Sequence, residues 1–217
     1  MLAISKMHRQ DAGDTIIEVL FAITIFSLIV VTALSLMNQG LATSQRSLET
    51  TLVRQQMDGQ AEALRFLHES YIQAYQSGQT FDLTDGVVSP AEEYYNIIEF
   101  VKDGGRGQAS KFGSTATCVV PSDAGKDFII NPVAAKLVNT SMKPAIFQNA
   151  ATYSQLVYAG NTLNATEGMW VEGVRSSLPP GANAGYIDFH IRACWNVVGS
   201  DIPMNLGTIV RLYEPRS

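Results

Sequence analysis

Charged residues are scarce in this chain, at 16% of 217 residues against the ~25% of an average soluble protein. Histidine occurs only as His8, His68 and His190, and cysteine only twice. The net charge is −5 and no run of lysine or arginine is present, which argues against a nucleic-acid surface along the whole chain. The sequence also lacks G-x-S-x-G, H-E-x-x-H and a phosphate loop, so we expect no enzyme, no cofactor and no metal site.

Proline is absent before Pro90, and charge is absent from Val19 to Met37. A helix over this uncharged run would be ~28 Å long, close to the ~30 Å hydrocarbon thickness of a membrane. Lys6 and Arg9 precede the run, and no lysine or arginine follows it until Arg46. The positive-inside rule therefore predicts a cytoplasmic N-terminus and places most of the chain outside the membrane.

Three interpretations of this segment compete. A secretory signal peptide has an apolar core of ~7–15 residues and a small-x-small cleavage site, whereas this run is longer and Ala33-Leu34-Ser35 is a weak site. A plain single-pass anchor does not explain Glu18. A carboxylate at the edge of the apolar run is costly unless it is paired, and an isolated anchor offers it no partner. The third interpretation is cleavage after Gly13, followed by bundling of the helices.

Cleavage after Gly13 makes Asp14 the first residue of the mature chain and Glu18 the fifth, one helical turn later. In a bundle of such helices, the new amino group of one chain can pair with Glu18 of a neighbour. A buried carboxylate of this kind selects the packing register, because an offset neighbour leaves it unpaired. Taken alone, Glu18 is equally well explained by solvation among lipid headgroups.

The junction Gly13-Asp14-Thr15-Ile16-Ile17-Glu18 resembles the leader junction of type IV pilins and type II secretion pseudopilins. The resemblance covers residues 1–40, in which the basic leader, the glycine, the glutamate and the apolar helix follow in the family's order. It implies that a prepilin peptidase cuts after Gly13 and methylates the amino group of Asp14. It also assigns Glu18 and Thr15 to filament assembly. Asp14 departs from the phenylalanine or methionine that is common at this position.

The resemblance implies a structural subunit, a pilin or pseudopilin, of a type IV pilus-like filament. Its expected partners are other pilins, the prepilin peptidase, the pilus assembly platform and the membrane that holds the precursor. We expect the precursor in the bacterial cytoplasmic membrane and the filament at the cell surface, serving adhesion, motility, DNA uptake or secretion. The rivals are a membrane-anchored binding or sensor module that does not polymerise and a secreted protein released near Ser35.

A helical pattern continues beyond the apolar run, because apolar residues recur at three- to four-residue spacing. This stripe comprises Val53, Met57, Ala61, Leu64, Leu67 or His68, Tyr71 and Tyr75, with Gln56, Gln60 and other polar residues on the remaining faces. Ser77-Gly78 is the expected end of the helix, and Gly40 is a candidate bend. We therefore predict a membrane or filament-core helix over 14–40, after a leader at 1–13, and an amphipathic continuation over 41–77.

Residues 78–217 are predicted to form a β-rich head. Ser89-Pro90-Ala91-Glu92 has the form of a capping box and predicts a short helix from Pro90 to about Val101. Strand patterns occupy 115–120, 128–130, 154–160, 169–174, 186–195 and 205–213. The expected fold class is α+β, with the second half of the long helix packed on an antiparallel sheet, and this arrangement resembles the pilin fold.

Strand 186–195 has an apolar face from Ile187 to Trp195 and a polar face that includes His190 and Cys194. Two cysteines in an exported domain favour a Cys118–Cys194 disulfide, although two buried thiols are the alternative. A disulfide in the C-terminal region is also common in the family that the chain resembles. His190 lies between Asp188 and Arg192 on the polar face and is more typical of a satisfied histidine than of a catalytic one.

Overall fold

The computed structural model describes residues 14–84, 86–87, 89–104, 118, 127–176, 185–197 and 199–215. The chain divides into two compact units, Met1–Arg46 and Ser47–Ser217. Helix α1 covers Asp14–Gln76 and belongs to both. The long helix is thereby confirmed, and it continues without a break through Gly40, the candidate bend. A single glycine costs a helix only ~1 kcal/mol, which the good helix formers around it offset. The leader, 1–13, lies outside the described residues.

Helix α1 ends at the predicted position through a Schellman motif. Gly78 has a φ of 78°, a conformation that glycine adopts without strain. Its N–H donates to the carbonyl of Tyr75 at 3.0 Å, and the N–H of Gln79 donates to the carbonyl of Ala74 at 3.1 Å. These two bonds satisfy carbonyl groups that the end of a helix otherwise leaves open.

The remaining elements belong to the second unit. They are α2 (Pro90–Gly104), β1 (Asp127–Asn131), β2 (Lys136–Asn139), the 3₁₀ helix η1 (Pro144–Ile146), β3 (Phe147–Gln148), β4 (Gln155–Ala159), β5 (Thr162–Glu167), β6 (Met169–Arg175), β7 (Tyr186–Trp195) and β8 (Met204–Tyr213). The larger sheet is antiparallel, in the order β2-β1-β6-β7-β8, and the smaller has the order β3-β5-β4, with β3 parallel to β5. The α+β class is confirmed. The predicted strand 115–120 lies outside the described residues except for Cys118, which is in no strand.

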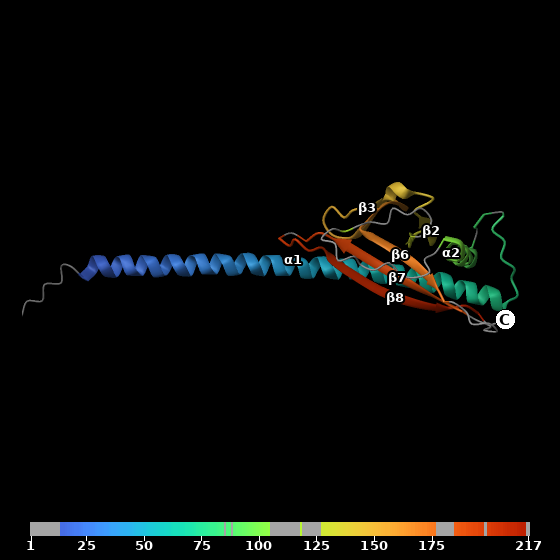
Figure 1. Cartoon of the computed structure of the whole chain (residues 1–217), viewed down its shortest axis with the longest axis horizontal. Coiled ribbons are helices and arrows are strands. Elements are labelled where there is room, and N and C mark those ends of the chain that lie inside the picture. The colour runs from blue at the N-terminus through green and yellow to red at the C-terminus, as the bar shows by residue number, and fades with distance from the viewer. Residues whose placement is uncertain are drawn as a thin grey trace, which may run out of the picture. The chain divides into compact units, whose positions relative to one another are not determined.

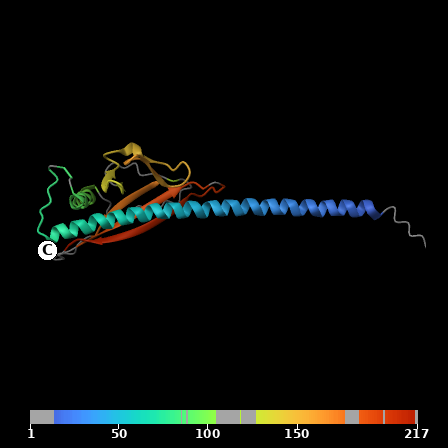
Figure 2. The same cartoon turned by 180° about the vertical axis from the view of Figure 1, so that it is seen from behind.

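The core of the second unit lies between α1 and one face of the larger sheet, which Figures 1 and 2 show from opposite sides. Val53, Leu64 and Leu67 of α1 are fully buried, as are Ile187 and Phe189 on the predicted apolar face of β7. Because an amphipathic helix buries only one stripe, this packing confirms the predicted second half of α1. Tyr75 is the exception among the predicted stripe, since it stands exposed in the last turn of the helix.

Polar side chains of α1 also enter this core, contrary to the prediction for Gln60. Its side-chain Nε2 donates to the carbonyl of Ile130 at 2.7 Å, and the N–H of Ile130 donates back to its Oε1 at 2.9 Å. The amide thus acts as a short extra strand beside β1, where β1 pairs with β6 only at Asp127 and Phe128. Glu49 accepts a hydrogen bond from the indole of Trp195, Gln56 from the N–H of Leu156, and His68 contacts the carbonyl of Tyr213.

Replacing Gln60 with leucine should lower the free energy of unfolding by about 2–5 kcal/mol. The change leaves the buried N–H and carbonyl of Ile130 without their partner, and each unsatisfied group costs ~1–3 kcal/mol. Gln55→Leu is the matched control, because Gln55 is exposed on the same helix. Urea denaturation of the two variants in detergent measures the difference, and equal stabilities would show that Gln60 contributes little.

Helix α2 begins with the predicted capping box. The N–H of Ser89 donates to the Glu92 carboxylate at 3.0 Å, and the N–H of Glu92 donates to the Ser89 hydroxyl at 3.2 Å. Glu93, in the next position, is buried, and its carboxylate accepts the N–H of Leu137 in β2 at 2.7 Å. Burial raises the pKa of Glu93, and the hydrogen bond from the N–H of Leu137 offsets part of this increase. The helix is thereby tied to the edge of the larger sheet.

The disulfide between Cys118 and Cys194 is present, which confirms that prediction. It ties a residue outside any regular element to the end of β7, as the polar-face position of Cys194 indicated. However, Cys194 and Arg192 are buried, so this end of the strand's second face is not a solvent surface. Arg192 pairs there with the fully buried Glu172, which also accepts the indole N–H of Trp170.

Candidate assembly surface

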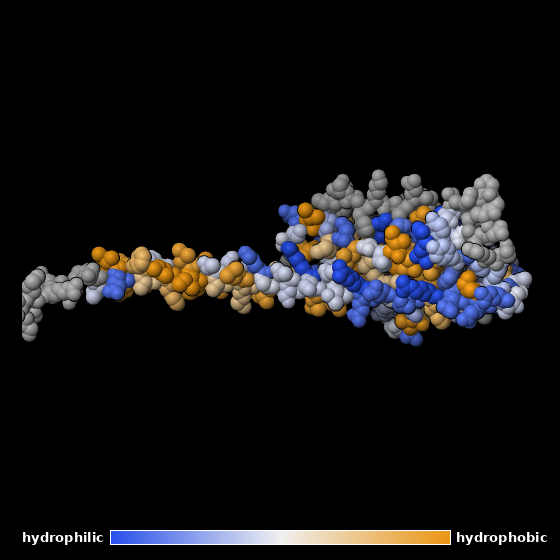
Figure 3. Space-filling view, turned by 90° about the horizontal axis from the view of Figure 1, so that it is seen from below, coloured by the Kyte–Doolittle hydropathy of each residue, from blue (hydrophilic) through white to orange (hydrophobic). Residues whose placement is uncertain are grey.

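The helical residues of the first unit present a largely apolar surface. Every residue from Thr15 to Gln45 is exposed, and Figure 3 shows apolar side chains gathered along this stretch of α1. The large ones are Ile16, Ile17, Val19, Leu20, Phe21, Ile23, Ile25, Phe26, Leu28, Ile29, Val30, Val31, Leu34, Leu36 and Met37. Contiguous apolar surface of this extent is rarely left open to water, and it marks contact with a membrane or with other proteins.

Apolar residues surround this helix on all sides rather than forming one stripe. From Ile16 to Ile29, the exposed large apolar side chains point in directions that together cover a full turn of the helix. A helix that is apolar all round is buried in a protein interior or in lipid. Consistently, α1 is the one helix in the described part of the chain that is long and apolar enough to cross a membrane.

The hydroxyl groups within the apolar stretch are satisfied by the helix itself. Thr24 donates to the carbonyl of Phe21 at 2.8 Å, Ser27 to that of Ile23 at 2.8 Å and Thr32 to that of Leu28 at 2.7 Å. A hydroxyl bonded in this way does not need water, so these residues do not prevent insertion into lipid.

Glu18 is the one ionisable side chain between Thr15 and Gln45. Both Thr15 and Glu18 are exposed, in the first turns of α1. The helix begins at Asp14, the residue predicted to follow the cleavage site, and the side chain of Asp14 and all of Gly13 lie outside the described part. A carboxylate near the N-terminal end of a helix is favoured by the helix dipole and available to a cationic partner.

Among the described residues, no group of three or more histidine, cysteine, aspartate or glutamate side chains could hold a metal ion. Asp188, which shares the polar face of β7 with His190, is bonded by Arg211 through two contacts of 2.7 and 2.8 Å. Arg211 holds the pKa of Asp188 below its usual range, and burial together with Arg192 lowers the pKa of His190. His8 lies outside the described residues.

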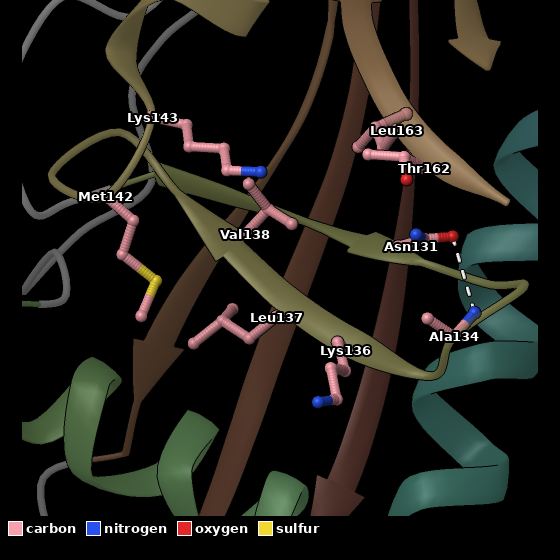
Figure 4. A pocket seen from close by; sticks show the side chains of 9 residues that line it. All are labelled: Asn131, Ala134, Lys136, Leu137, Val138, Met142, Lys143, Thr162 and Leu163. Atoms are coloured by element: carbon pink, nitrogen blue, oxygen red, sulfur yellow. Dashed lines mark hydrogen bonds between the residues drawn. The ribbon is translucent and has the colours of Figure 1, made fainter. Parts of the chain in front are cut away.

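One shallow hollow of about 220 Å³ opens between β2 and β5 (Figure 4). Its walls are mainly apolar, from Leu137, Val138, Met142 and Leu163, and Lys136 and Lys143 also contribute to its lining. No acidic or histidine side chain lines it. Sequence patterns did not indicate this hollow, because β2 and β5 are short and their pairing partners are not local.

No family model, no curated protein and no solved structure matches the chain. The function is therefore inferred from the chain's own residues.

Proposed function

We propose that the protein is a structural subunit of a type IV pilus-like filament, assembled through residues 14–40 after removal of the leader. One observation carries this proposal: the segment 15–45 of α1 is exposed throughout and largely apolar, and it contains a single ionisable residue, Glu18, one turn after Asp14. A plain membrane anchor explains the apolar surface but not the carboxylate. A filament core explains both.

In this mechanism the membrane first holds the precursor, with Lys6 and Arg9 on the cytoplasmic side. Cleavage after Gly13 creates a new amino group on Asp14, and the helices then leave the lipid to form a bundle. Lipid tails are as apolar as the side chains they cover, so the hydrophobic effect does not favour the bundle over the bilayer. Packing and the pairing of Glu18 with a neighbour's amino group must supply the preference, and the pairing also fixes the stagger between chains.

The second unit suits the outside of such a filament. It has its own core on α1 and a disulfide, and disulfides persist in oxidising compartments beyond the cytoplasm. In the proposal, this head covers the helical bundle and makes the outward contacts of the filament, whether these serve adhesion, motility, DNA uptake or secretion.

Cleavage is the first step to test. We expect that co-expression with a prepilin peptidase converts the full chain to a product that starts at Asp14, as shown by intact mass and N-terminal sequencing. Gly13→Leu should remain uncut under the same conditions, because the peptidase recognises the junction glycine. A product that starts after Ser35, or a wild-type chain left uncut, would contradict the filament proposal.

The alternative is a single-pass membrane-anchored binding module, and the hollow near Lys136 and Lys143 is the observation that favours it. Such a module would keep its leader and would not change on replacement of Glu18. It would instead lose binding when Lys136 and Lys143 are replaced, whereas a filament subunit with the same replacements would still polymerise. Electron microscopy of cells that express each variant separates the two functions.

A further inference from the structure

Strand β8 forms one edge of the larger sheet, because it pairs only with β7 among the described strands. The N–H of Glu214 donates to the carbonyl of Gly185 across the β7–β8 pair. In an antiparallel pair, successive residues direct their backbone groups alternately toward and away from the partner. The even-numbered residues of β8 therefore form backbone hydrogen bonds with β7. Asn205, Gly207, Ile209 and Arg211 direct their N–H and carbonyl groups away from β7, beyond the edge of the sheet.

This edge lacks the features that usually prevent edge-to-edge pairing. Natural edge strands are kept short or carry lysine, proline or bulges. By contrast, β8 runs regularly from Met204 to Tyr213, with neither lysine nor proline. Its one charged residue, Arg211, is already bonded to Asp188, while Ile209 and Tyr213 are 60% and 62% exposed.

The solvent-exposed face of β8 carries a hollow and, farther along the strand, an aromatic side chain of a size to fill the same hollow in a second copy. A hollow of about 260 Å³ lies at Gly207, where the strand has no side chain, and His190, Arg192 and Ile209 contribute to its lining. Tyr213 stands exposed farther along the same face, since side chains two apart share a face. The ring of His68 contacts the backbone carbonyl of Tyr213, so the part of β8 with unpaired backbone groups ends at this residue.

We propose that β8 is a self-association surface, at which two copies of this chain pair their β8 edges antiparallel about a two-fold axis through Val210. This register sets Tyr213 of each copy opposite Gly207 of the other, so that the aromatic ring covers the hollow. Aromatic residues opposite glycines are a recognised stabilising arrangement in sheets. It also sets Ile209 opposite the aliphatic stem of Arg211. A slip by two residues loses the match between Tyr213 and Gly207.

The charges and the backbone groups are compatible with this register. Ile209 and Arg211 both direct their N–H and carbonyl groups outward, so they form hydrogen-bonded pairs across the axis in both directions. The two Arg211 side chains lie diagonally, ~7–8 Å apart, but each is neutralised by its own Asp188. A second copy of this chain offers a tyrosine and a glycine at the matching positions.

Such a two-fold contact is closed, so it joins heads in pairs and does not by itself extend a filament. It is separate from the apolar helix and does not depend on the proposed filament function. Between two filaments of this protein, the β8 contact would join the filaments side by side through their heads.

The test keeps the apolar helices apart. Full-length chains are placed singly in lipid nanodiscs, and mass photometry measures how many discs associate in pairs. We expect wild-type discs to pair, and Ile209→Lys to weaken pairing at least about tenfold, because each new lysine stands opposite an Arg211. Ile209→Glu should retain or strengthen pairing through the same arginine. Ile202→Lys is the matched control, since Ile202 is 74% exposed and lies outside β8.

Cross-linking tests the register. Discs carrying Ile209→Cys, mixed with discs carrying Arg211→Cys, should form mixed disulfide dimers faster than either variant forms dimers with itself. The melting temperature of each variant checks that the head is folded. Wild-type discs that stay single, equal effects of lysine at 202 and 209, or equal cross-linking in all mixtures would overturn the proposal.

Discussion

Replacing Glu18 with glutamine should abolish filament assembly and leave cleavage after Gly13 intact. In the proposed bundle, the carboxylate pairs with the amino group of a neighbouring chain, and glutamine keeps the size of the side chain but removes its charge. Breaking a buried charge pair costs ~3–5 kcal/mol, because the remaining amino group stays buried and unpaired. This corresponds to a loss of roughly 10²–10⁴ in the equilibrium constant of each subunit contact.

Electron microscopy of sheared filaments, together with N-terminal sequencing of the membrane fraction, measures assembly and cleavage separately. Glu62→Gln is the matched control, because it makes the same change at an exposed position on the same helix. Glu18→Asp should retain part of the assembly, since the charge remains on a shorter side chain. Normal filaments from the Glu18→Gln chain would contradict the assigned role and favour a solvated carboxylate on an anchor.

Gly168→Ala should destabilise the head by more than about 3 kcal/mol. Gly168 lies between β5 and β6 with a φ of 65°, and a Cβ there would stand 2.2 Å from the carbonyl oxygen of Cys194. That carbonyl belongs to the backbone of β7 and cannot rotate away. The N–H of Gly168 also donates to Gln148 at 2.7 Å, and its carbonyl accepts from Cys194 at 2.8 Å, so a shift of this residue disturbs both sheets.

Gly160→Ala separates the two causes. Gly160 has a similar φ of 63° but open space around the position of a Cβ, so its substitution should cost only the ~1–2 kcal/mol of left-handed backbone. Urea denaturation of the full chain in detergent, followed by the fluorescence of Trp170 and Trp195, compares the variants. Equal losses at the two glycines would show that the contact with Cys194 is relaxed without cost.

Local sequence patterns predicted the features whose causes are local. The capping box at Ser89 and the glycine at Gly78 determine helix ends through bonds within a few residues. The alternation in β7 and the stripe from Val53 to Leu67 follow from burying one face of each element. For the same reason, the apolar surface that carries the proposed assembly site could be recognised directly, since its signal is composition and order.

The missed features depend on contacts between residues far apart in sequence. Gln60 has the residue type of an exposed helix face, and only the gap beside Ile130 makes it a core residue. Arg192 and Cys194 were expected on a polar surface, but the Glu172 ion pair and the disulfide place them inside. Strands β2 and β5 are short and contain polar residues, so their patterns are weak and their pairing decides their structure.

The polar contacts along α1 have a mechanical consequence. The contacts of Glu49, Gln56, Gln60 and His68 with the two sheets are spread over roughly 28 Å of helix. Tension applied along α1 loads these contacts side by side in shear, so they must break together rather than one after another. If the chain is pulled by its N-terminal helix, the head would thus stay packed on α1 under a force that would unzip contacts arranged in sequence.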